Sequence, residues 1–118
     1  MSYKLGNINN RAVLIKADQY YDVESISKNA VSSNTVEALS KAKELNDLSA
    51  NLENESPTGH LSDVVLGNPV PDSKNCYAVG LNYRKHAEES GMEIPDAPMV
   101  FTKHTSCFVG PTANVEMR

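Results

Sequence analysis

The sequence contains no tryptophan, two phenylalanines and two cysteines among its 118 residues. Aromatic residues make up 6% of the chain, so a hydrophobic core must be built mainly from aliphatic side chains. No apolar run of about eighteen residues is present, which argues against a transmembrane helix. The N-terminal stretch "MSYKLGNINN" also lacks the apolar core of a signal peptide. We therefore expect a cytoplasmic protein.

The chain also lacks an excess of basic residues. Its formal net charge is −4, and its pI is about 5.3. Binding to nucleic acid or to a membrane surface normally needs a basic face, so we expect neither kind of partner.

The two cysteines, Cys76 and Cys107, are too few for a disulfide framework. Each stands in an apolar, strand-like context, which favours two reduced and buried thiols. A pairing in an oxidising compartment stays open. No Cys-x-x-Cys or Cys/His spacing indicates zinc.

The first seventy residues predict a small module rich in β-structure. Residues 12–17 and 19–26 read as strands of an antiparallel meander, and Asn9-Asn10 is a plausible turn. The spacing of the apolar residues then changes to that of one helix over residues 34–52. Asn34 is its predicted cap, and Glu37 stands at the capping-box spacing. The apolar stripe of this helix consists of Val36, Leu39, Ala42, Leu45, Leu48 and Leu52.

A polar loop (residues 53–63) and an extended connector with two prolines (residues 64–75) follow. We place the domain boundary here, with an N-terminal β/α module at residues 1–70 and a second part at residues 71–118. In the second part, residues 76–83 predict a buried strand, and residues 84–91 predict a short helix that ends at Gly91. Residues 99–110 return to a strand. The expected fold class is α+β, mostly β.

His86 and Glu89 are the main candidates for chemistry. Residues three apart on a helix share a face, so the two side chains can lie next to each other. A carboxylate beside an imidazole fixes its tautomer and stabilises its charged form, and such a pair can move a proton. From the residues alone, a solvated surface pair is the favoured explanation of the pattern, because a lone H-x-x-E on a short helix is usually that. Lys103 and His104 are similarly ambiguous, and His60, in a polar loop, is given no role.

The stretch from Val79 to Met117 resembles the opening motif of the fumarylacetoacetate hydrolase family. That family has a strand reading roughly "vGlNY", then "HaxE", then "P-x-x-P-x-x-F-x-K", and then a Ser/Thr turn and a glycine. The matching residues here are Gly80, Asn82, Tyr83, His86, Glu89, Pro95, Pro98, Phe101, Lys103, Ser106 and Gly110. The preceding residues resemble the small N-terminal module of bacterial members. The resemblance implies the first strands of a mixed β-roll, and usually a homodimer.

The resemblance also implies a reaction class. Members cleave or rearrange acylpyruvate-like and 2-oxo or enol dicarboxylate substrates, some of them in the breakdown of aromatic compounds. His86 and Glu89 would form the acid–base dyad, and Lys103, Tyr83 and Arg84 would contact the small-molecule 2-oxo acid. A divalent metal, Mg²⁺ or Mn²⁺, would bind the substrate's oxygens. Hydrolysis, decarboxylation and isomerisation all stay open, as does the exact substrate.

The sequence departs from the family at the metal ligands. The family holds its metal through an E-x-E pair and a later Asp, whereas the only acid after Lys103 is Glu116. Glu53 and Glu55 spell E-x-E, but they precede His86 and receive no metal role. We therefore expect a truncated gene, a fragment or one part of a split enzyme that is inactive alone. The alternative is a non-catalytic binding or assembly module.

Overall fold

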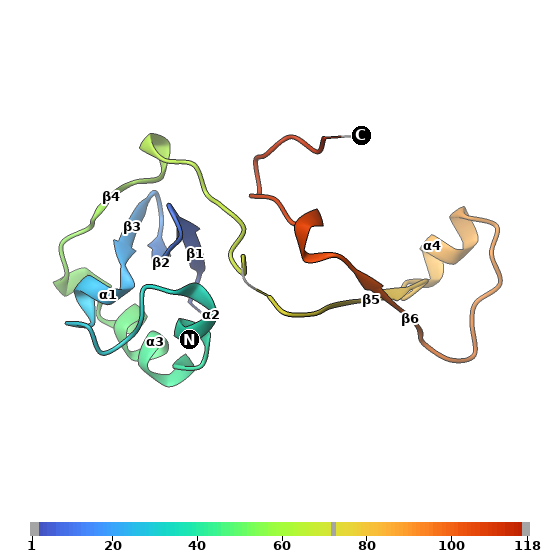
Figure 1. The fold of residues 1–118 in the computed structure, drawn as a ribbon, viewed down its shortest axis with the longest axis horizontal. Helices are drawn as coiled ribbons and strands as arrows, with labels where there is room; N and C mark the ends of the chain where they lie inside the picture. The colour runs from blue at the N-terminus through green and yellow to red at the C-terminus, as the bar shows by residue number, and fades with distance from the viewer. Residues whose placement is uncertain (1–2, 72, 117–118) are drawn as a thin grey trace. The chain divides into compact units, whose positions relative to one another are not determined.

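The computed structural model describes residues 3–71 and 73–116, drawn as a ribbon in Figure 1. Backbone contacts divide these residues into two units. The first unit consists of residues 3–71 together with 108–116, and the second of residues 73–107. The predicted class, mixed α and β with mostly sheet, is confirmed. Within the described ranges, no helix is both long and apolar enough to cross a membrane.

The first unit is built on a four-stranded antiparallel sheet in the order β1-β2-β3-β4. Its strands are β1 (Leu5–Ile8), β2 (Arg11–Lys16), β3 (Gln19–Asp22) and β4 (Gly59–His60). A two-residue turn joins β1 to β2, and both of its residues, Asn9 and Asn10, have positive φ values of 52° and 61°. Asparagine tolerates this left-handed conformation, which a tight hairpin turn requires. The predicted meander and its first turn are therefore confirmed.

Three short helices pack against one face of this sheet, as Figure 1 shows. They are α1 (Val23–Ile26), α2 (Thr35–Leu39) and α3 (Ala42–Ala50), and the one-turn helix η1 (Leu52–Asn54) follows them. Aliphatic side chains from the sheet and the helices interlock in a single core, as the low aromatic content requires. The buried core consists of Ala12, Leu14, Tyr21, Val23, Val31, Ala38, Leu45 and Leu52.

Two sequence predictions for this unit were wrong in part. The strand predicted over residues 19–26 ends at Asp22, because the Asp22 carboxylate accepts a hydrogen bond from the Ser25 amide at 2.9 Å and starts α1. The single helix predicted over residues 34–52 is divided at Ser40 and Lys41. The Ser40 hydroxyl donates to the Glu37 carbonyl at 2.6 Å, a local bond that competes with helix continuation.

The division of the helix changes which side chains are buried. In α2 the core residues are Thr35 and Ala38, whereas Val36 and Leu39 of the predicted stripe are exposed. In α3 the stripe holds in part: Leu45 is fully buried and Leu48 is half-buried, whereas Ala42 is exposed. The predicted cap is confirmed, because the Asn34 side chain accepts hydrogen bonds from the amides of Val36 and Glu37 at 2.9 and 3.0 Å.

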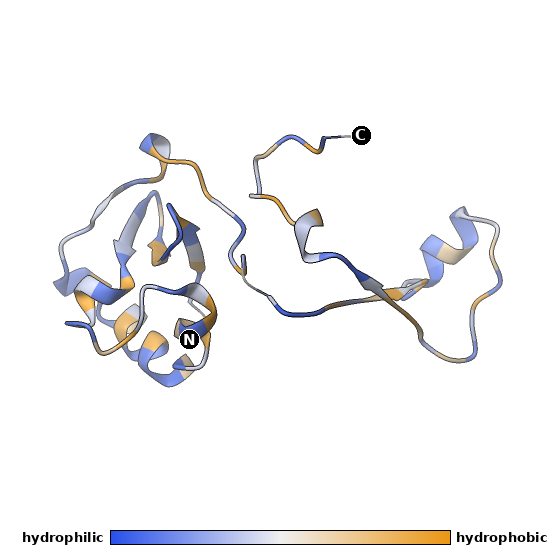
Figure 2. Ribbon diagram, in the orientation of Figure 1, coloured by the Kyte–Doolittle hydropathy of each residue, from blue (hydrophilic) through white to orange (hydrophobic). Residues whose placement is uncertain are grey.

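The connector after the short helix η2 (Leu61–Asp63) is held against the edge of β1. Its first part is apolar (Figure 2), and the Leu66 side chain lies over Gly6. Asn7 bonds it twice: its carbonyl accepts from the Gly67 amide at 2.8 Å, and its side-chain nitrogen donates to the Asn68 carbonyl at 2.7 Å. Gly110 lies so close to the Leu66 carbonyl that a Cβ would collide with it. The connector is thus fixed by its hydrogen bonds to Asn7 and by the close approach of Gly110.

The second unit is an antiparallel hairpin of β5 (Cys76–Gly80) and β6 (Met99–Lys103), with α4 (Arg84–Glu89) in the long loop between them. Gly91, at φ 64°, ends α4 as predicted. The Gly91 amide donates to the Glu88 carbonyl at 3.2 Å, and the Met92 amide donates to the Ala87 carbonyl at 3.0 Å. These are the two bonds of a Schellman motif.

Both faces of this hairpin carry exposed apolar side chains. Tyr77 and Val100 are 66% and 59% exposed, and Phe101 is 44% exposed. Ala87 is the one buried hydrophobic residue in the described part of this unit. The strand predicted at residues 76–83 is present but shorter than expected, and the prediction that it is buried was wrong. A two-stranded ribbon has no second layer to cover either face.

Candidate active site

The helix α4 brings His86 and Glu89 to one face. The helix begins after Tyr83, whose carbonyl accepts hydrogen bonds from the amides of His86 and Ala87 at 3.0 and 3.2 Å. Ala87, a residue of this helix, is buried, and its burial fixes which side of α4 faces the rest of the second unit. His86 and Glu89 are both exposed to solvent. Among the described residues, no hydrogen bond or ion pair joins their side chains, so the imidazole and the carboxylate are neighbours without being bonded.

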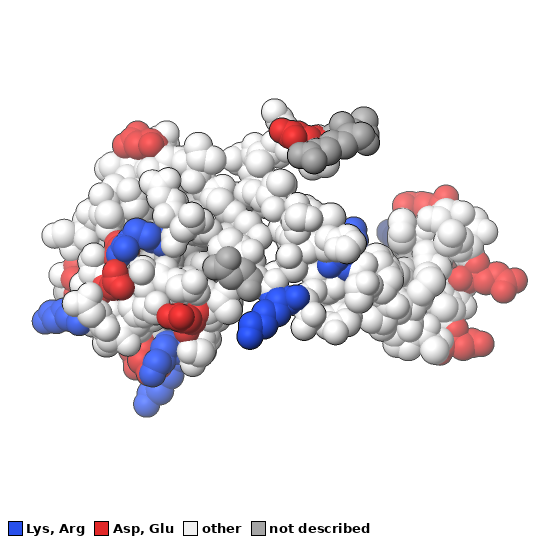
Figure 3. Space-filling model, in the orientation of Figure 1, with Lys and Arg blue, Asp and Glu red and all other residues white. Residues whose placement is uncertain are grey.

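Tyr83 and Arg84 lie at the same end of the hairpin as His86 and Glu89. The chain leaves β5 through Leu81, which takes a left-handed conformation at φ 51°. A non-glycine residue there is uncommon, and it turns the chain sharply from the strand towards the helix. Tyr83 is 74% exposed, and Arg84 is also exposed. Acidic side chains dominate this end of the second unit, as Figure 3 shows.

Lys103 lies at the other end of the hairpin. The pairing register places Gly80 opposite Met99 near α4, and Cys76 opposite Lys103 at the far end. Four residue steps along a strand span about 14 Å. The hairpin therefore separates Lys103 from the helix that carries His86 and Glu89.

A cleft of about 250 Å³ surrounds Lys103. It brings Lys103 together with a second lysine, Lys74, and with His104, so its polar groups favour an anion such as a carboxylate. Sequence reasoning missed Lys74, although a lysine just before one strand and another at the end of its antiparallel partner must meet. The cleft is lined by Lys74, Asn75, Cys76, Thr102, Lys103, His104 and Thr105.

The cysteines differ in exposure. Cys76 is half-buried and Cys107 is exposed, and both are free thiols. The expectation of two unpaired thiols holds, whereas the expected burial of Cys107 was wrong. Cys107 is the last residue of the one-turn helix η3 (Thr105–Cys107), where no second layer covers its side chain.

The described residues do not provide a metal centre. Across residues 3–71 and 73–116, no three His, Cys, Asp or Glu side chains gather closely enough to hold a metal ion. Glu53 is occupied elsewhere, with its carboxylate 3.8 Å from the Lys16 ammonium. A divalent metal therefore does not fit the donor groups that this part of the chain presents.

The strongest electrostatic coupling lies in the first unit. The Arg11 guanidinium donates to the Asp22 carboxylate at 2.7 and 3.0 Å and to the Glu24 carboxylate at 2.7 Å. The bonds from Arg11 and, to a smaller extent, those from Ser25 lower the pKa of Asp22 to about 2, against the opposing effect of burial. The hydrogen bond from Arg11 also lowers the pKa of Glu24, and the bonds to the two carboxylates raise the pKa of Arg11. Since every member is satisfied, this network stabilises the fold and is not a reactive site.

Comparison with known proteins links the C-terminal part of the chain, residues 75–118, to a described domain. Residues 75–118 match the family model "Fumarylacetoacetate (FAA) hydrolase C-terminal". The chain is 56% identical over 46 residues to an oxaloacetate tautomerase, YisK, of Bacillus subtilis, covering 36% of this chain and 15% of that protein. It is 38% identical over 81 residues to a 2,4-didehydro-3-deoxy-L-rhamnonate hydrolase of a Sphingomonas strain, covering 69% of this chain and 26% of the relative.

A solved structure is similar over nearly the whole chain. The crystal structure of a Mycobacterium smegmatis protein assigned as HpcE matches with a TM-score of 0.77 and 28% sequence identity. The match covers 97% of this chain and 40% of that protein. The chain thus spans well under half the length of each of these three proteins.

Proposed function

Because the chain belongs to the fumarylacetoacetate hydrolase family, we propose that it supplies the acid–base dyad and a substrate-binding segment of an enzyme for small 2-oxo acids. The observation that supports this proposal is that His86 and Glu89 both belong to α4, three residues apart and so on one helix face, directly after the "GLNY" turn. Both side chains are open to solvent and to an incoming substrate.

The proposed chemistry assigns one role to each residue. The His86 imidazole takes a proton from a water molecule, or from the carbon next to a keto group, and returns it later in the reaction. The Glu89 carboxylate stabilises the imidazolium that forms. Tyr83 and Arg84 contact the substrate from the start of the helix. Lys103 with Lys74 binds a carboxylate at the other end of the hairpin, too far from His86 for one small 2-oxo acid to contact both.

The divalent metal is a separate proposal, which rests on the family. Members of the family generally use a divalent metal, which would stabilise the enolate when bound, and Mg²⁺ or Mn²⁺ is expected. The described residues do not gather the donors for it. We propose that these 118 residues do not turn over substrate alone, and that a homodimer in the cytoplasm is the working form.

The first experiment measures turnover of acylpyruvate and oxaloacetate by the 118-residue chain with Mg²⁺ or Mn²⁺. No turnover is expected. Turnover that disappears with a chelator would contradict the proposal that the chain is not competent alone. Sedimentation of the same sample tests the proposed dimer. A monomer at every concentration measured would contradict it.

The dyad is tested in an active protein. Residues 75–118 replace the corresponding segment of the Bacillus subtilis tautomerase, and oxaloacetate tautomerisation is followed. His86→Ala should lower kcat by at least about 100-fold with little change in KM, and Glu89→Gln by less. Lys85→Ala, a change on the same helix, is the matched control and should keep the rate. Full activity of both dyad variants would refute the assignment.

A second candidate is a non-catalytic binding or assembly module. The closed core of the first unit favours it, as does the lack of gathered metal donors within residues 3–71 and 73–116. It predicts that the chain binds no oxalate, which mimics the pyruvate enolate. Stoichiometric, Mg²⁺-dependent oxalate binding measured by calorimetry would rule this candidate out.

A further inference from the structure

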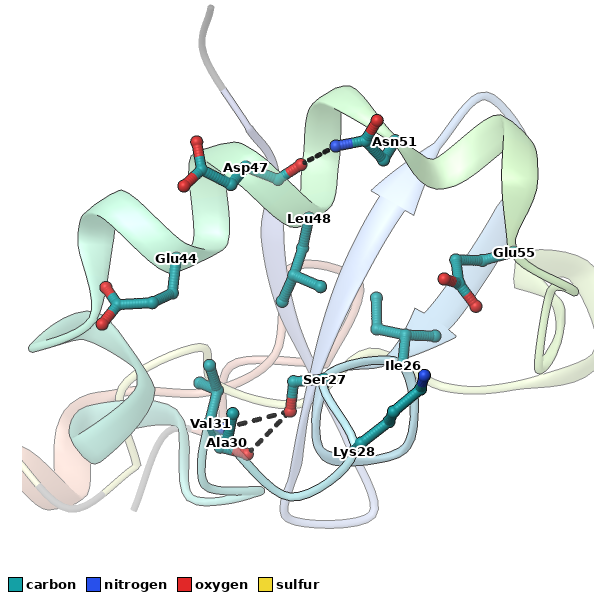
Figure 4. A pocket seen from close by; sticks show the side chains of 10 residues that line it. All are labelled: Ile26, Ser27, Lys28, Ala30, Val31, Glu44, Asp47, Leu48, Asn51 and Glu55. Carbon is teal, nitrogen blue, oxygen red and sulfur yellow. Dashed lines mark hydrogen bonds between the residues drawn. The ribbon is translucent and has the colours of Figure 1, made fainter.

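The first unit carries a groove that the proposed reaction does not use. It lies between α3 and the segment that runs from the end of α1 to Val31, and has a volume of about 410 Å³. Leu48 and Ile26 point into it from opposite walls, as Figure 4 shows. Its lining consists of Ile26, Ser27, Lys28, Ala30, Val31, Glu44, Asp47, Leu48, Asn51 and Glu55.

The helical wall follows from the spacing of α3. Positions 44, 47, 48 and 51 are three or four residues apart, so they form one stripe along the helix. Leu45 lies on the neighbouring stripe and is fully buried in the core. The core therefore fixes the rotation of α3, and this rotation turns Leu48 towards the groove (Figure 4).

The opposite wall is held in place by Ser27. Its hydroxyl accepts a hydrogen bond from the Val31 amide at 3.0 Å and donates to the Glu24 carbonyl at 3.1 Å. Between these bonds, Lys28 and Asn29 take left-handed conformations at φ 53° and 66°. The wall is thus a specific turn, and the groove exists without a ligand.

The rim of the groove is negative. It carries three carboxylates, from Glu44, Asp47 and Glu55, against the single ammonium of Lys28. Glu44 has a partner at 3.7 Å, the exposed Lys41. Among the described residues, no ion pair involves Asp47, Glu55 or Lys28. In Figure 4 the Glu44 and Glu55 carboxylates stand at the two ends of the hollow. A ligand with an apolar stem and a cationic end complements this arrangement.

We propose that this groove binds an arginine or lysine side chain, flanked by an aliphatic residue, on a segment of a partner protein. The stem of the basic side chain packs on Leu48 and Ile26, and its charged end meets the carboxylates. The flanking aliphatic residue covers the rest of the apolar floor. The inference does not depend on the proposed reaction, since it uses residues of the first unit alone.

The partner is a protein segment rather than a small amine for a geometric reason. Ligand pockets normally enclose about 70–90% of a small molecule. Here most of the rim residues are themselves exposed to solvent, including Lys28, Glu44, Asp47 and Glu55. A free amine in so open a groove keeps much of its surface in water. A side chain that is brought in by a larger surface gains affinity from contacts outside the groove.

The test is an NMR titration of the full 118-residue chain with the peptide acetyl-Leu-Arg-Leu-amide. Amide signals of residues 26–31 and 44–55 should shift, and the binding should weaken when salt rises from about 0.05 to about 0.5 M. The same peptide with citrulline in place of arginine keeps the shape but loses the charge, and should shift these signals far less.

Two double variants separate the groove from general surface charge. Glu44→Gln/Glu55→Gln should weaken binding about 2- to 30-fold, since each exposed pair contributes about 0.2–1 kcal/mol. Glu37→Gln/Asp63→Asn removes the same charge away from the groove and should leave the affinity unchanged. Shifts outside the groove, equal binding of the citrulline peptide, or equal loss in both double variants would overturn the proposal. Butylguanidine binding as tightly as the peptide would show that the site serves a small amine, which also contradicts it.

Discussion

Removing the charge of Asp22 should destabilise the first unit in a pH-dependent way. Its carboxylate accepts two bonds from Arg11 and caps α1 at Ser25, and its own amide donates to the Thr58 hydroxyl at 2.8 Å. Asp22→Asn keeps an oxygen for the cap but loses the charge. Asp22→Ala loses both, and the lost cap adds about 1 kcal/mol.

The magnitude follows from the pKa of Asp22. Its pKa falls from an ordinary 3.8 to about 2 in the folded chain. At about 1.36 kcal/mol per unit this is about 2 kcal/mol. The Arg11 side chain is 44% exposed, so solvent screens part of the attraction. We expect a loss of about 1–2 kcal/mol for Asp22→Asn at pH 7.

The direction with pH is fixed by the sign of the shift. The folded pKa lies below the unfolded one, so the stabilisation is complete above about pH 5 and is lost as the pH falls through about 2. The difference between wild type and Asp22→Asn should therefore shrink to roughly one third of its neutral value by about pH 2.5.

Urea unfolding measures this difference best when it is followed through the amide signals of Val13, Leu14 and Tyr21. These report the first unit and not the hairpin. Asp18→Asn removes an exposed acid from the turn between β2 and β3 and should change stability by less than about 0.5 kcal/mol. A difference between wild type and Asp22→Asn that stays constant from pH 7 to pH 2.5 would refute the argument, because it would not come from the titration of Asp22.

Two further predictions concern packing. Leu45→Ala should destabilise the first unit by about 2–5 kcal/mol in the same urea assay, because Leu45 is fully buried between α3 and the sheet; Lys43→Ala, on the exposed side of α3, should change stability by less than about 0.5 kcal/mol. In hydrogen exchange, amides of β5 and β6 should exchange at least about 100-fold faster than those of β2, since the hairpin buries almost nothing. Equal protection of the two units would show that the hairpin is covered.

Local chemistry made much of the fold predictable. The paired asparagines predicted the first turn, Asn34 predicted the start of α2, and Gly91 predicted the end of α4. Each prediction succeeded because the effect acts within a few residues. The break at Ser40 was missed, since the apolar spacing continues across it and only a side-chain bond interrupts the helix. The residues before and after such a break belong to two helices with different buried faces. A regular apolar spacing in the sequence does not show which of these residues are buried.

The candidate site, like the fold, was predictable from the sequence only in part. The neighbourhood of His86 and Glu89 follows from helical spacing and needs no tertiary information. The separation of Lys103 from them depends on the register of β5 and β6, and the cleft with Lys74 depends on the same pairing. Register is set across the chain by contacts that sequence spacing does not contain.

The distribution of sulfur between the two units has a consequence for oxidation. The core of the first unit contains no methionine or cysteine, whereas Met92, Met99 and both cysteines belong to the second unit. Met92 and Met99 are exposed, and so is the Cys107 thiol. A methionine sulfoxide at either position would place a polar group on the apolar surface that any covering layer must contact. Among the described residues, mild oxidants can therefore alter what the hairpin associates with while the first unit keeps its packing.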